Sequence, residues 1–439
     1  MRLINPLNWP YKVVSRIPLL ALLSLLVLGS RSVAQSPETP VRIPFEPTVT
    51  YGEGYGEEAV AKQAQTRFDL KLFDQLLQQH PEENLFFSPL SIRLALSMVY
   101  NGASGETQAA IAEVLEAEEL SITELNWTNA QWMRHLVERS HPSPGADDEQ
   151  AKVQVQIANG LWVDQAVTLR PQFLQALASY YQAVVNRVDF GSRQTVEDIN
   201  TWVEDRTQGK IDRIVDRLSR DDLMVLLNAI YFKGDWTQPF DPARTEMRPF
   251  TRLDGSQVQV PLMAQSGRYG YLETDQVQVV RLPYGQGEME MLVLLPKEGV
   301  DLETLRADLN PETWQEWTGS LQVRAGSVRI PKFNLAYETD LIPVLDQLGM
   351  GIAFSDRADF SQMTSEPAQA QISQVLHKAV IEVNEEGSEA AAVTGVIISR
   401  TAIDREEPFQ LVADRPFWFA IRDTETGTVL FMGSVVDPQ

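Results

Sequence analysis

The spacing of apolar residues predicts that the folded part of the chain begins with a helix near residue 61. From Ala61 onward apolar side chains recur every three or four residues, as on one face of an amphipathic helix: Phe68, Leu72, Phe73, Leu76 and Leu77. His80 and Pro81 end this pattern, because a proline disrupts the interior of a helix.

Helical and strand-like patterns share the rest of the chain. Helical periodicity covers roughly residues 90–101, 106–117, 129–140, 171–180 and 194–205. Runs rich in β-branched and aromatic residues, typical of strands, are Val153–Trp162, Leu223–Phe232, Val277–Leu282, Met289–Leu295 and Val328–Phe333. Helices gather in the first half and strands in the second, with no repeat and no second linker. We therefore expect an α+β fold in one large domain, residues 61–439.

The residues before this domain have a different composition. Residues 35–59 contain four prolines and three glycines and have no helical or strand period. We expect residues 35–60 to form an extended tether outside the fold.

The first 34 residues resemble a secretory leader. Residues 17–29 form an apolar run of 13 residues, preceded by basic residues and followed by Ser32-Val33-Ala34, which has small residues at the positions that signal peptidase recognises. The run is shorter than the roughly 20 residues that span a bilayer. We expect residues 1–34 to be a cleaved signal peptide and the protein to be exported, extracellular or periplasmic; the alternative is an uncleaved membrane anchor.

Composition excludes several classes of protein. Hydrophobic residues make up 44% of the chain and charged residues 22%, which is typical of a soluble protein with a large core. The chain has no cysteine, so disulfides, thiolate metal sites and a lipoprotein anchor are excluded. The net charge is −23 and would be about −27 without the leader, which holds four basic and no acidic residues. Such a charge repels nucleic acid and sulfated polysaccharides.

The sequence contains no recognisable catalytic or metal-binding motif. Its four histidines are His80, His135, His141 and His377, and none belongs to an HExxH motif. A GxSxG nucleophile elbow, a GxGxxG motif and a phosphate-binding loop are also missing. We expect neither an enzyme nor a cofactor or metal site.

One long segment between two strands stands out. Ala379–Val383 alternates like a strand and Phe409–Val412 begins another, with more than 20 residues between them. A connection of this length in a compact domain is usually functional or disordered. We expect a functional loop; the alternative is a flexible linker rich in alanine and glycine.

The first half of this loop has the period of a strand. Every second residue from Ser388 is small or apolar: Ser388, Ala390, Ala392, Thr394, Val396 and Ile398. The other face carries Glu389, the only charge in this span. Because alternate side chains of a strand point to opposite faces, one face of this segment is suited to burial. The segment could therefore be a loop in one state and a strand in another.

Several motifs, in order along the chain, resemble those of the serpin family. The resemblance covers most of residues 65–438, and a set of motifs in one order is far more specific than any single motif. The matching segments are Asn84–Ile92 (NLFFSPLSI), Asn101–Ala103, Gly105–Thr107, Asn228–Trp236 (NAIYFKGDW) with Pro239-Phe240, His377–Ala379, Glu385–Ala392, Asp414–Phe417 and Phe431–Gly433.

The resemblance implies a fold and a mechanism. The fold has three β-sheets, about nine helices and an exposed reactive loop at about residues 385–408 of a metastable protein. A target protease cuts this loop and forms an acyl-enzyme, and the loop then inserts into the central sheet as an extra strand, which releases stored strain. The inhibitor is consumed once, so it is not an enzyme.

The resemblance also assigns residues to the site. It implies a loop hinge of Glu386, Gly387, Ser388, Glu389, Ala390, Ala391, Ala392, Val393 and Thr394. Ser91, Asn228 and His377 would form a hydrogen-bonded cluster beneath the sheet that must open, and Trp236 would lie at the top, where insertion begins. The residue count from Ser388 places the cut bond between Thr401 and Ala402, whereas a trypsin-like protease would cut after Arg400 or Arg405; we leave this choice open.

Two rival functions remain. A non-inhibitory serpin, such as a carrier or chaperone, tends to have charged, bulky or proline residues at inward hinge positions, and Ser388, Ala390, Ala392 and Thr394 are none of these. A cysteine protease as target is the second rival.

We expect a monomer that forms a covalent complex with its protease, without stable membrane association after leader cleavage. Glycosaminoglycan activation is not expected, because the only lysines or arginines in residues 120–145 are Arg134 and Arg139, and the same range carries Glu124 and Glu138.

Overall fold

The computed structural model describes residues 55–139, 153–364, 370–388 and 407–439, which all belong to one unit, Arg42–Gln439. The described helices are α1 (Tyr55–Gln79), α2 (Pro89–Tyr100), α3 (Gly105–Val114), α4 (Ile122–Arg139), α5 (Pro171–Tyr181), α6 (Arg193–Arg206), α7 (Leu302–Ala307), α8 (Pro311–Gly319) and α9 (Ile342–Leu345). The expected leader (residues 1–34) and most of the expected tether lie outside the described residues.

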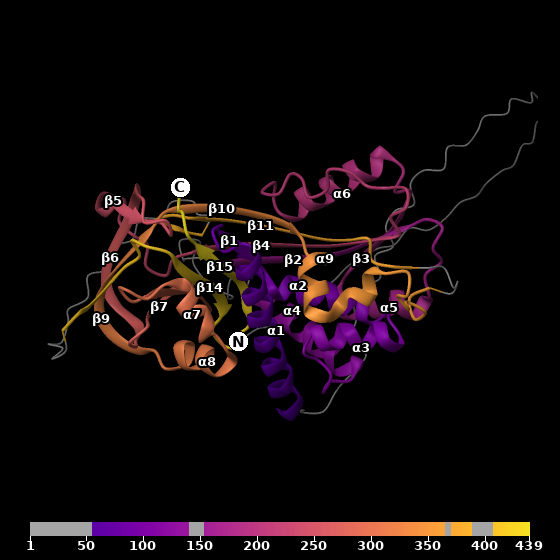
Figure 1. The fold of residues 1–439 in the computed structure, drawn as a ribbon, viewed down its shortest axis with the longest axis horizontal. Coiled ribbons are helices and arrows are strands. Elements are labelled where there is room, and N and C mark those ends of the chain that lie inside the picture. Colours follow the sequence, from indigo (N-terminus) through magenta and orange to yellow (C-terminus); the bar gives the residue numbers. More distant parts are fainter. Residues whose placement is uncertain (1–54, 140–152, 365–369, 389–406) are drawn as a thin grey trace, which may run out of the picture. The chain divides into compact units, whose positions relative to one another are not determined.

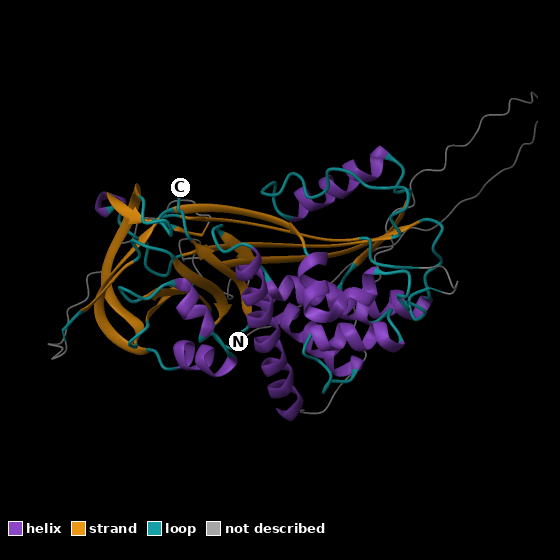
Figure 2. Cartoon of the chain, in the orientation of Figure 1, coloured by secondary structure: helices purple, strands orange, loops and turns teal. Residues whose placement is uncertain are grey.

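A six-stranded sheet crosses this unit between two layers of helices (Figure 1). In spatial order its strands are β10 (Phe333–Asp340), β11 (Gln374–Val383), β12 (Gly387–Ser388), β4 (Met224–Asp235), β2 (Val153–Asp164) and β3 (Val184–Val188). Helix α6 covers one face, and α1 to α5 gather on the other (Figures 1 and 2).

The strands of this sheet contribute to two separate apolar clusters, one on each face. Along β4, Met224, Leu226, Ile230 and Phe232 join the main core, whereas three residues between them join a small cluster beneath α6: Val225, Leu227 and Ala229. The sheet is therefore buried on both sides over this stretch, which explains why β4 is apolar from Met224 to Phe232 except at Asn228.

A larger, nine-stranded sheet packs beside the first. It contains β1 (Leu85–Phe87), β15 (Val429–Val435), β14 (Phe417–Asp423), β8 (Met289–Pro296), β7 (Val277–Tyr284), β6 (Gln257–Glu273), β9 (Gln322–Pro331) and β13 (Phe409–Val412), with β5 (Glu246–Thr251) paired to β6. Strand β6 has 17 residues, and its two ends pair with different neighbours, so two of the three expected sheets run into one another through it. The predicted α+β fold is confirmed.

Three boundaries differ from the prediction. Helix α1 begins at Tyr55, six residues before Ala61, so the expected tether cannot extend to residue 60. Helix α4 begins at Ile122 and not near residue 129, because Ser121 and Glu124 form a capping box in which each backbone N–H donates to the other side chain. The single strand expected at Val328–Phe333 is wrong: the chain leaves β9 at Pro331 and enters β10, in the other sheet, at Phe333.

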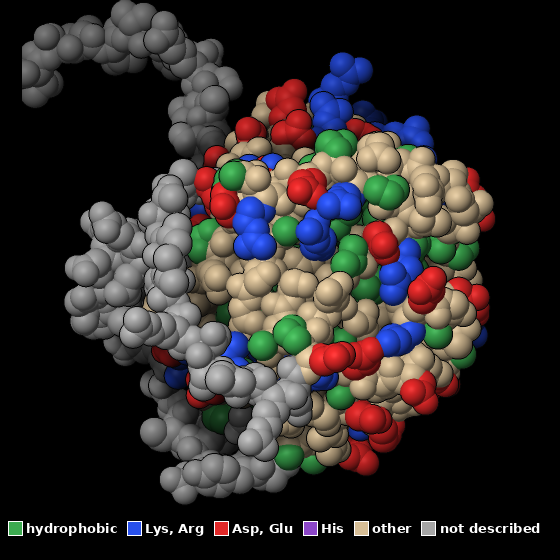
Figure 3. Space-filling model, turned by 90° about the vertical axis from the view of Figure 1, so that its left-hand side faces the viewer, with side chains coloured by type: hydrophobic (Ala, Val, Ile, Leu, Met, Phe, Trp, Pro, Cys, Tyr) green, Lys and Arg blue, Asp and Glu red, His purple; other side chains and the backbone are tan. Residues whose placement is uncertain are grey.

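The negative charge of the chain does not form a single patch on the end of the unit that carries β5, β6 and β9. On the described part of that face, acidic and basic side chains are interspersed (Figure 3). Among the described residues, no helix is long and apolar enough to span a bilayer.

Candidate functional site

The candidate site is the boundary between β11 and β4 in the six-stranded sheet. At one end the two strands pair directly, in parallel, through Gln374–Leu376 and Val225–Leu227. At the other end β12 lies between them, with Ser388 opposite Val383 on one side and Gly234 on the other. Gly387 and Ser388 therefore occupy the start of a strand position between β11 and β4, and the two strands pair directly farther along.

The turn before β12 is held by backbone hydrogen bonds from the chain beyond β4. The Trp236 backbone N–H donates to Glu386 O at 2.8 Å, and the Trp236 indole N–H donates to Asn384 O at 2.9 Å. The Phe240 N–H donates to Glu385 O at 2.8 Å. The Asn384 side chain accepts from the N–H groups of Glu386 and Gly387, which is an Asx turn. This region is therefore a defined structure and not a disordered end of the loop.

Two buried aromatic side chains line the hinge. The rings of Trp236 and Tyr284 stack with centroids 4.2 Å apart and an interplanar angle of 10°. The Tyr284 hydroxyl shares a hydrogen bond of 2.6 Å with Ser388 Oγ. Burial raises the pKa of Tyr284 well above its ordinary value, so the phenol stays protonated and neutral. Ser388 is thus buried and satisfied, as a small polar residue in this position must be.

Glu385 ties the turn to Lys332, which lies between β9 and β10, and to Thr245, which follows the 3-10 turn at Pro242–Arg244. Lys332 Nζ lies 2.8 Å from one Glu385 carboxylate oxygen, and the Thr245 hydroxyl donates to the other at 2.8 Å. Burial acts to raise the pKa of Glu385, but the hydrogen bonds from Lys332 and Thr245 outweigh it, and the pKa is lowered. Glu385 is therefore ionised at neutral pH and holds the hinge against the sheet.

Gly387 allows the close approach of β12 to β4. A Cβ atom at this position would lie 2.1 Å from the Gly234 carbonyl oxygen, which no side chain can tolerate without a backbone shift. A glycine is therefore required where the loop enters the sheet.

A second set of buried polar residues lies farther along β11, close to the end where β11 and β4 pair directly. The Ser88 N–H donates to His377 Nε2 at 3.2 Å, and the Ser88 hydroxyl caps α2 by accepting from the Ser91 N–H at 3.2 Å. All three residues are buried, and the Ser91 hydroxyl has no hydrogen-bond partner among the described residues. Burial lowers the pKa of His377 to about 4, so the imidazole is neutral and its Nε2 can accept.

The pKa of His377 gives the first testable prediction. The unfolded chain takes up a proton here below the ordinary pKa of 6.5, whereas the folded protein stays neutral down to about pH 4. Stability should therefore fall as the pH decreases from 6.5 to 4, by about 3 kcal/mol in total. Urea unfolding at several pH values measures this slope, which His377→Gln should flatten relative to the wild type. An unchanged slope in His377→Gln would contradict the assignment.

Comparison with known proteins decides the family. The family model for "Serpin (serine protease inhibitor)" matches residues 63–438. The chain belongs to the serpin family. It is 35% identical to human neuroserpin over 400 residues, which cover 88% of this chain and 93% of neuroserpin.

Solved serpin structures have the same fold. The thermophilic serpin tengpin in its native state superposes with a TM-score of 0.80 at 30% identity, covering 90% of this chain and 98% of tengpin. Thyroxine-binding globulin in complex with thyroxine superposes with a TM-score of 0.75 at 30% identity, covering 86% of this chain and 99% of that protein. The serpin fold of this chain is thus established.

The structure separates the predicted site residues into two places. Glu386, Gly387 and Ser388 lie beside Trp236 at the open end of the boundary. Ser91 and His377 lie near Ser88, farther along the sheet; Asn228 pairs with Asn159 in the β2–β4 ladder, and its side chain is outside the described part. The remaining hinge residues (Glu389, Ala390, Ala391, Ala392, Val393 and Thr394) and the candidate bond residues (Arg400, Thr401, Ala402 and Arg405) also lie outside the described residues.

Sequence patterns did not identify several residues of the site. Ser88 could have been found, because a serine before a proline is a typical helix N-cap and first helical residue. The contacts of Tyr284 with Ser388 and of Lys332 with Glu385 join residues far apart in sequence, and no local signal identifies them. No group of three acidic or histidine side chains arranged for a metal is present in the described ranges.

Proposed function

We propose that this serpin inhibits a serine-type protease by inserting its cut loop between β11 and β4. The observation that carries the proposal is β12, which lies between these two strands while the strands still pair directly farther along. Insertion would extend a strand that has already begun.

The register of β12 predicts where each loop residue would lie. Counting on from Ser388, Glu389 falls between Lys233 and Glu382, and Thr394 falls between Asn228 and His377. Ile397 would fall between Val225 and Gln374, which now pair with each other. The registers with β4 and with β11 therefore agree along the whole segment. One continuous strand would fit between β4 and β11 once the three residue pairs that now join them directly have separated.

The side chains of the loop suit both faces of this position. Even-numbered residues from Ser388 to Ile398 would join Phe232, Ile230 and Leu226 on the side of the main core, and they are small or apolar. Ala391, Val393, Gly395 and Ile397 would face the cluster beneath α6, where Leu227 and Val225 lie. Glu389, the only charge, would lie beside Lys233 near the open end, where Glu382 is exposed. A flexible linker has no need of such a match.

Inhibition would depend on an ester that joins the protease serine to the cut loop. The protease serine attacks the carbonyl carbon at the cut bond, the peptide C–N bond breaks, and the new amine leaves with a proton. The serpin stays joined to the protease as an ester, and insertion of the loop then carries the protease along the sheet and distorts its active site. The new strand gains backbone hydrogen bonds on both sides, which supplies the driving force. The cut follows Arg400 or Thr401.

A carrier function is the second candidate, because thyroxine-binding globulin shares this fold. The small hinge residues of this chain favour inhibition over it. The same step would trap a cysteine protease, with a thioester in place of the ester.

We also propose that residues 1–34 direct export, that the inhibitor acts as a monomer, and that no glycosaminoglycan is required. The last proposal is supported by α4 (Ile122–Arg139), in which the only arginines or lysines, Arg134 and Arg139, are matched by two glutamates, Glu124 and Glu138.

Incubation with proteases tests this function. The protein without its leader is mixed with trypsin-, chymotrypsin-, elastase- and subtilisin-like enzymes and run on denaturing gels. We expect a band at the summed mass with one of them, and a released fragment that begins at Thr401 or Ala402. Cleavage by every enzyme without such a band would reject inhibition and direct the search to ligands.

A further inference from the structure

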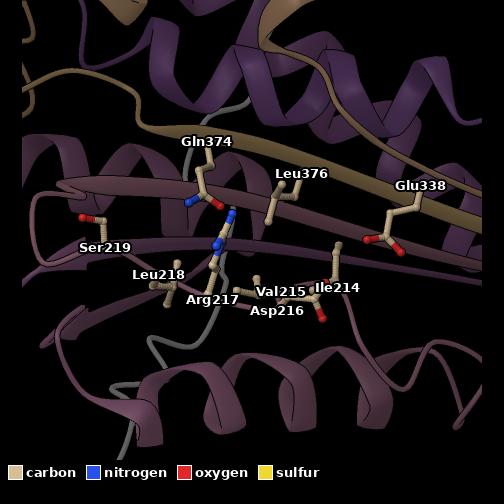
Figure 4. Close-up of a pocket in the computed structure, with 9 residues that line it drawn as sticks. All are labelled: Ile214, Val215, Asp216, Arg217, Leu218, Ser219, Glu338, Gln374 and Leu376. Carbon is tan, nitrogen blue, oxygen red and sulfur yellow. The ribbon is translucent and has the colours of Figure 1, made fainter.

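A cavity of about 490 Å³ lies on the α6 side of the six-stranded sheet (Figure 4). One wall is the segment Ile214–Ser219, which follows α6. The other wall is formed by Glu338 of β10 with Gln374 and Leu376 of β11. The volume is within the range of sites that bind small organic molecules.

The two walls belong to opposite sides of the boundary that opens in the proposed mechanism. A short turn, in which the Ser219 N–H donates to Asp222, joins the segment Ile214–Ser219 to β4, which begins at Met224. Gln374 and Leu376 lie on β11 and pair with Val225 and Leu227 of β4. The cavity therefore spans the line along which β4 and β11 must separate.

The cavity combines an apolar surface with one cationic side chain, Arg217. Ile214, Val215, Leu218 and Leu376 provide the apolar part. The Arg217 side chain extends from its segment toward the strand that carries Gln374 (Figure 4), and Arg217 has no ion pair among the described residues.

The acidic groups around Arg217 are already engaged. Glu338 pairs with Lys378 at 2.9 Å and Asp216 pairs with Arg213 at 3.1 Å. Asp222, which follows this segment, accepts hydrogen bonds from the Ser219 N–H and from Gln374 Nε2. A ligand with an anionic group could therefore bind Arg217 without displacing an internal partner, and the Ser219 hydroxyl retains its donor for the same group.

We propose that this cavity binds an amphipathic organic anion, with a carboxylate or sulfonate on Arg217 and an apolar body against Val215, Leu218 and Leu376, and that the bound anion holds the sheet closed. This rests on the proposed loop insertion. Insertion of a strand would separate β4 from β11 by one strand spacing, about 4.8 Å, and would move the walls apart. A ligand that contacts both walls binds the closed sheet more tightly, so by linkage it must oppose insertion.

Anilinonaphthalene sulfonate is a suitable probe, because it is an apolar anion that fluoresces when it leaves water. We expect saturable binding to the intact protein, about tenfold weaker binding to Arg217→Gln, and unchanged binding to Arg220→Gln. Arg220 is the matched control, because it is exposed and follows this segment directly but does not line the cavity. The protein cut within residues 389–406 should bind the probe at least tenfold more weakly, and the probe should slow formation of the protease complex.

The outcomes separate this proposal from the proposed function. Equal binding to the wild type and Arg217→Gln, or no binding to the intact protein, overturns the site, whatever the gels show. Arg217-dependent binding that is equally tight after loop cleavage overturns the coupling to sheet opening. A failure to trap any protease would reject the function, while Arg217-dependent binding to the intact protein would still support the site.

Discussion

Thr394→Arg should convert this serpin from an inhibitor into a substrate. In the register of β12, residue 394 falls between His377 and Asn228 on the side of the main core, where His377 is buried. An unpaired guanidinium there costs several kcal/mol. A penalty of ~3 kcal/mol would slow insertion about 100-fold relative to hydrolysis of the ester. Gels should therefore show cleaved serpin in place of the complex, and Ala390→Arg should behave in the same way.

Glu389→Arg is the matched control. Residue 389 would lie on the opposite face, next to Glu382, which is exposed. An arginine there stays in solvent, so we expect trapping close to that of the wild type. Normal inhibition by Thr394→Arg, or equal loss in both variants, would contradict the proposed orientation of the inserted strand.

Trp236→Ala should produce the largest loss of stability among the hinge variants. The side chain is 2% exposed, stacks on Tyr284 and donates to the carbonyl of Asn384. Removal of a buried tryptophan typically costs about 3–5 kcal/mol, because it leaves a cavity. Thermal unfolding of the intact protein measures the loss, and the turn that precedes β12 should become accessible to proteolysis.

Trp236→Phe provides the comparison. A phenylalanine can keep the stack on Tyr284 but cannot donate to Asn384, so its cost should be about 1 kcal/mol. If Trp236→Ala were as stable as Trp236→Phe, the ring would not contribute to the packing of the hinge.

Much of the fold follows from local patterns in the sequence. The apolar spacing of Phe68 and Leu72 predicts the first helix, and the continuous run Met289–Leu295 predicts a strand that is indeed fully buried. The alternation of Ala379–Val383 predicts β11, whose odd-numbered residues face the core. These features depend on near neighbours, and the period of the residues is enough to identify them.

The errors arise where contacts distant in sequence decide the structure. Val328–Phe333 has the composition of one strand, yet Pro331 and Phe333 belong to different sheets because their partners, Leu262 and Val383, lie far apart in the chain. The hinge contacts of Glu385 with Lys332 and of Ser388 with Tyr284 are set by the packing of these sheets. The family motifs single out Trp236, and only the structure shows that its indole N–H donates to Asn384 O.

A reversible lock across the boundary tests the central proposal most directly. Because the chain has no cysteine, Val225→Cys with Gln374→Cys introduces one pair of thiols at opposed positions of β4 and β11. The oxidised protein should be cleaved by the target protease without a covalent complex, and reduction should restore the complex, whereas the single variant Val225→Cys should trap protease under both conditions. If the oxidised double variant trapped protease as well as the reduced one, the loop would not insert between β4 and β11, and the proposed mechanism would be wrong.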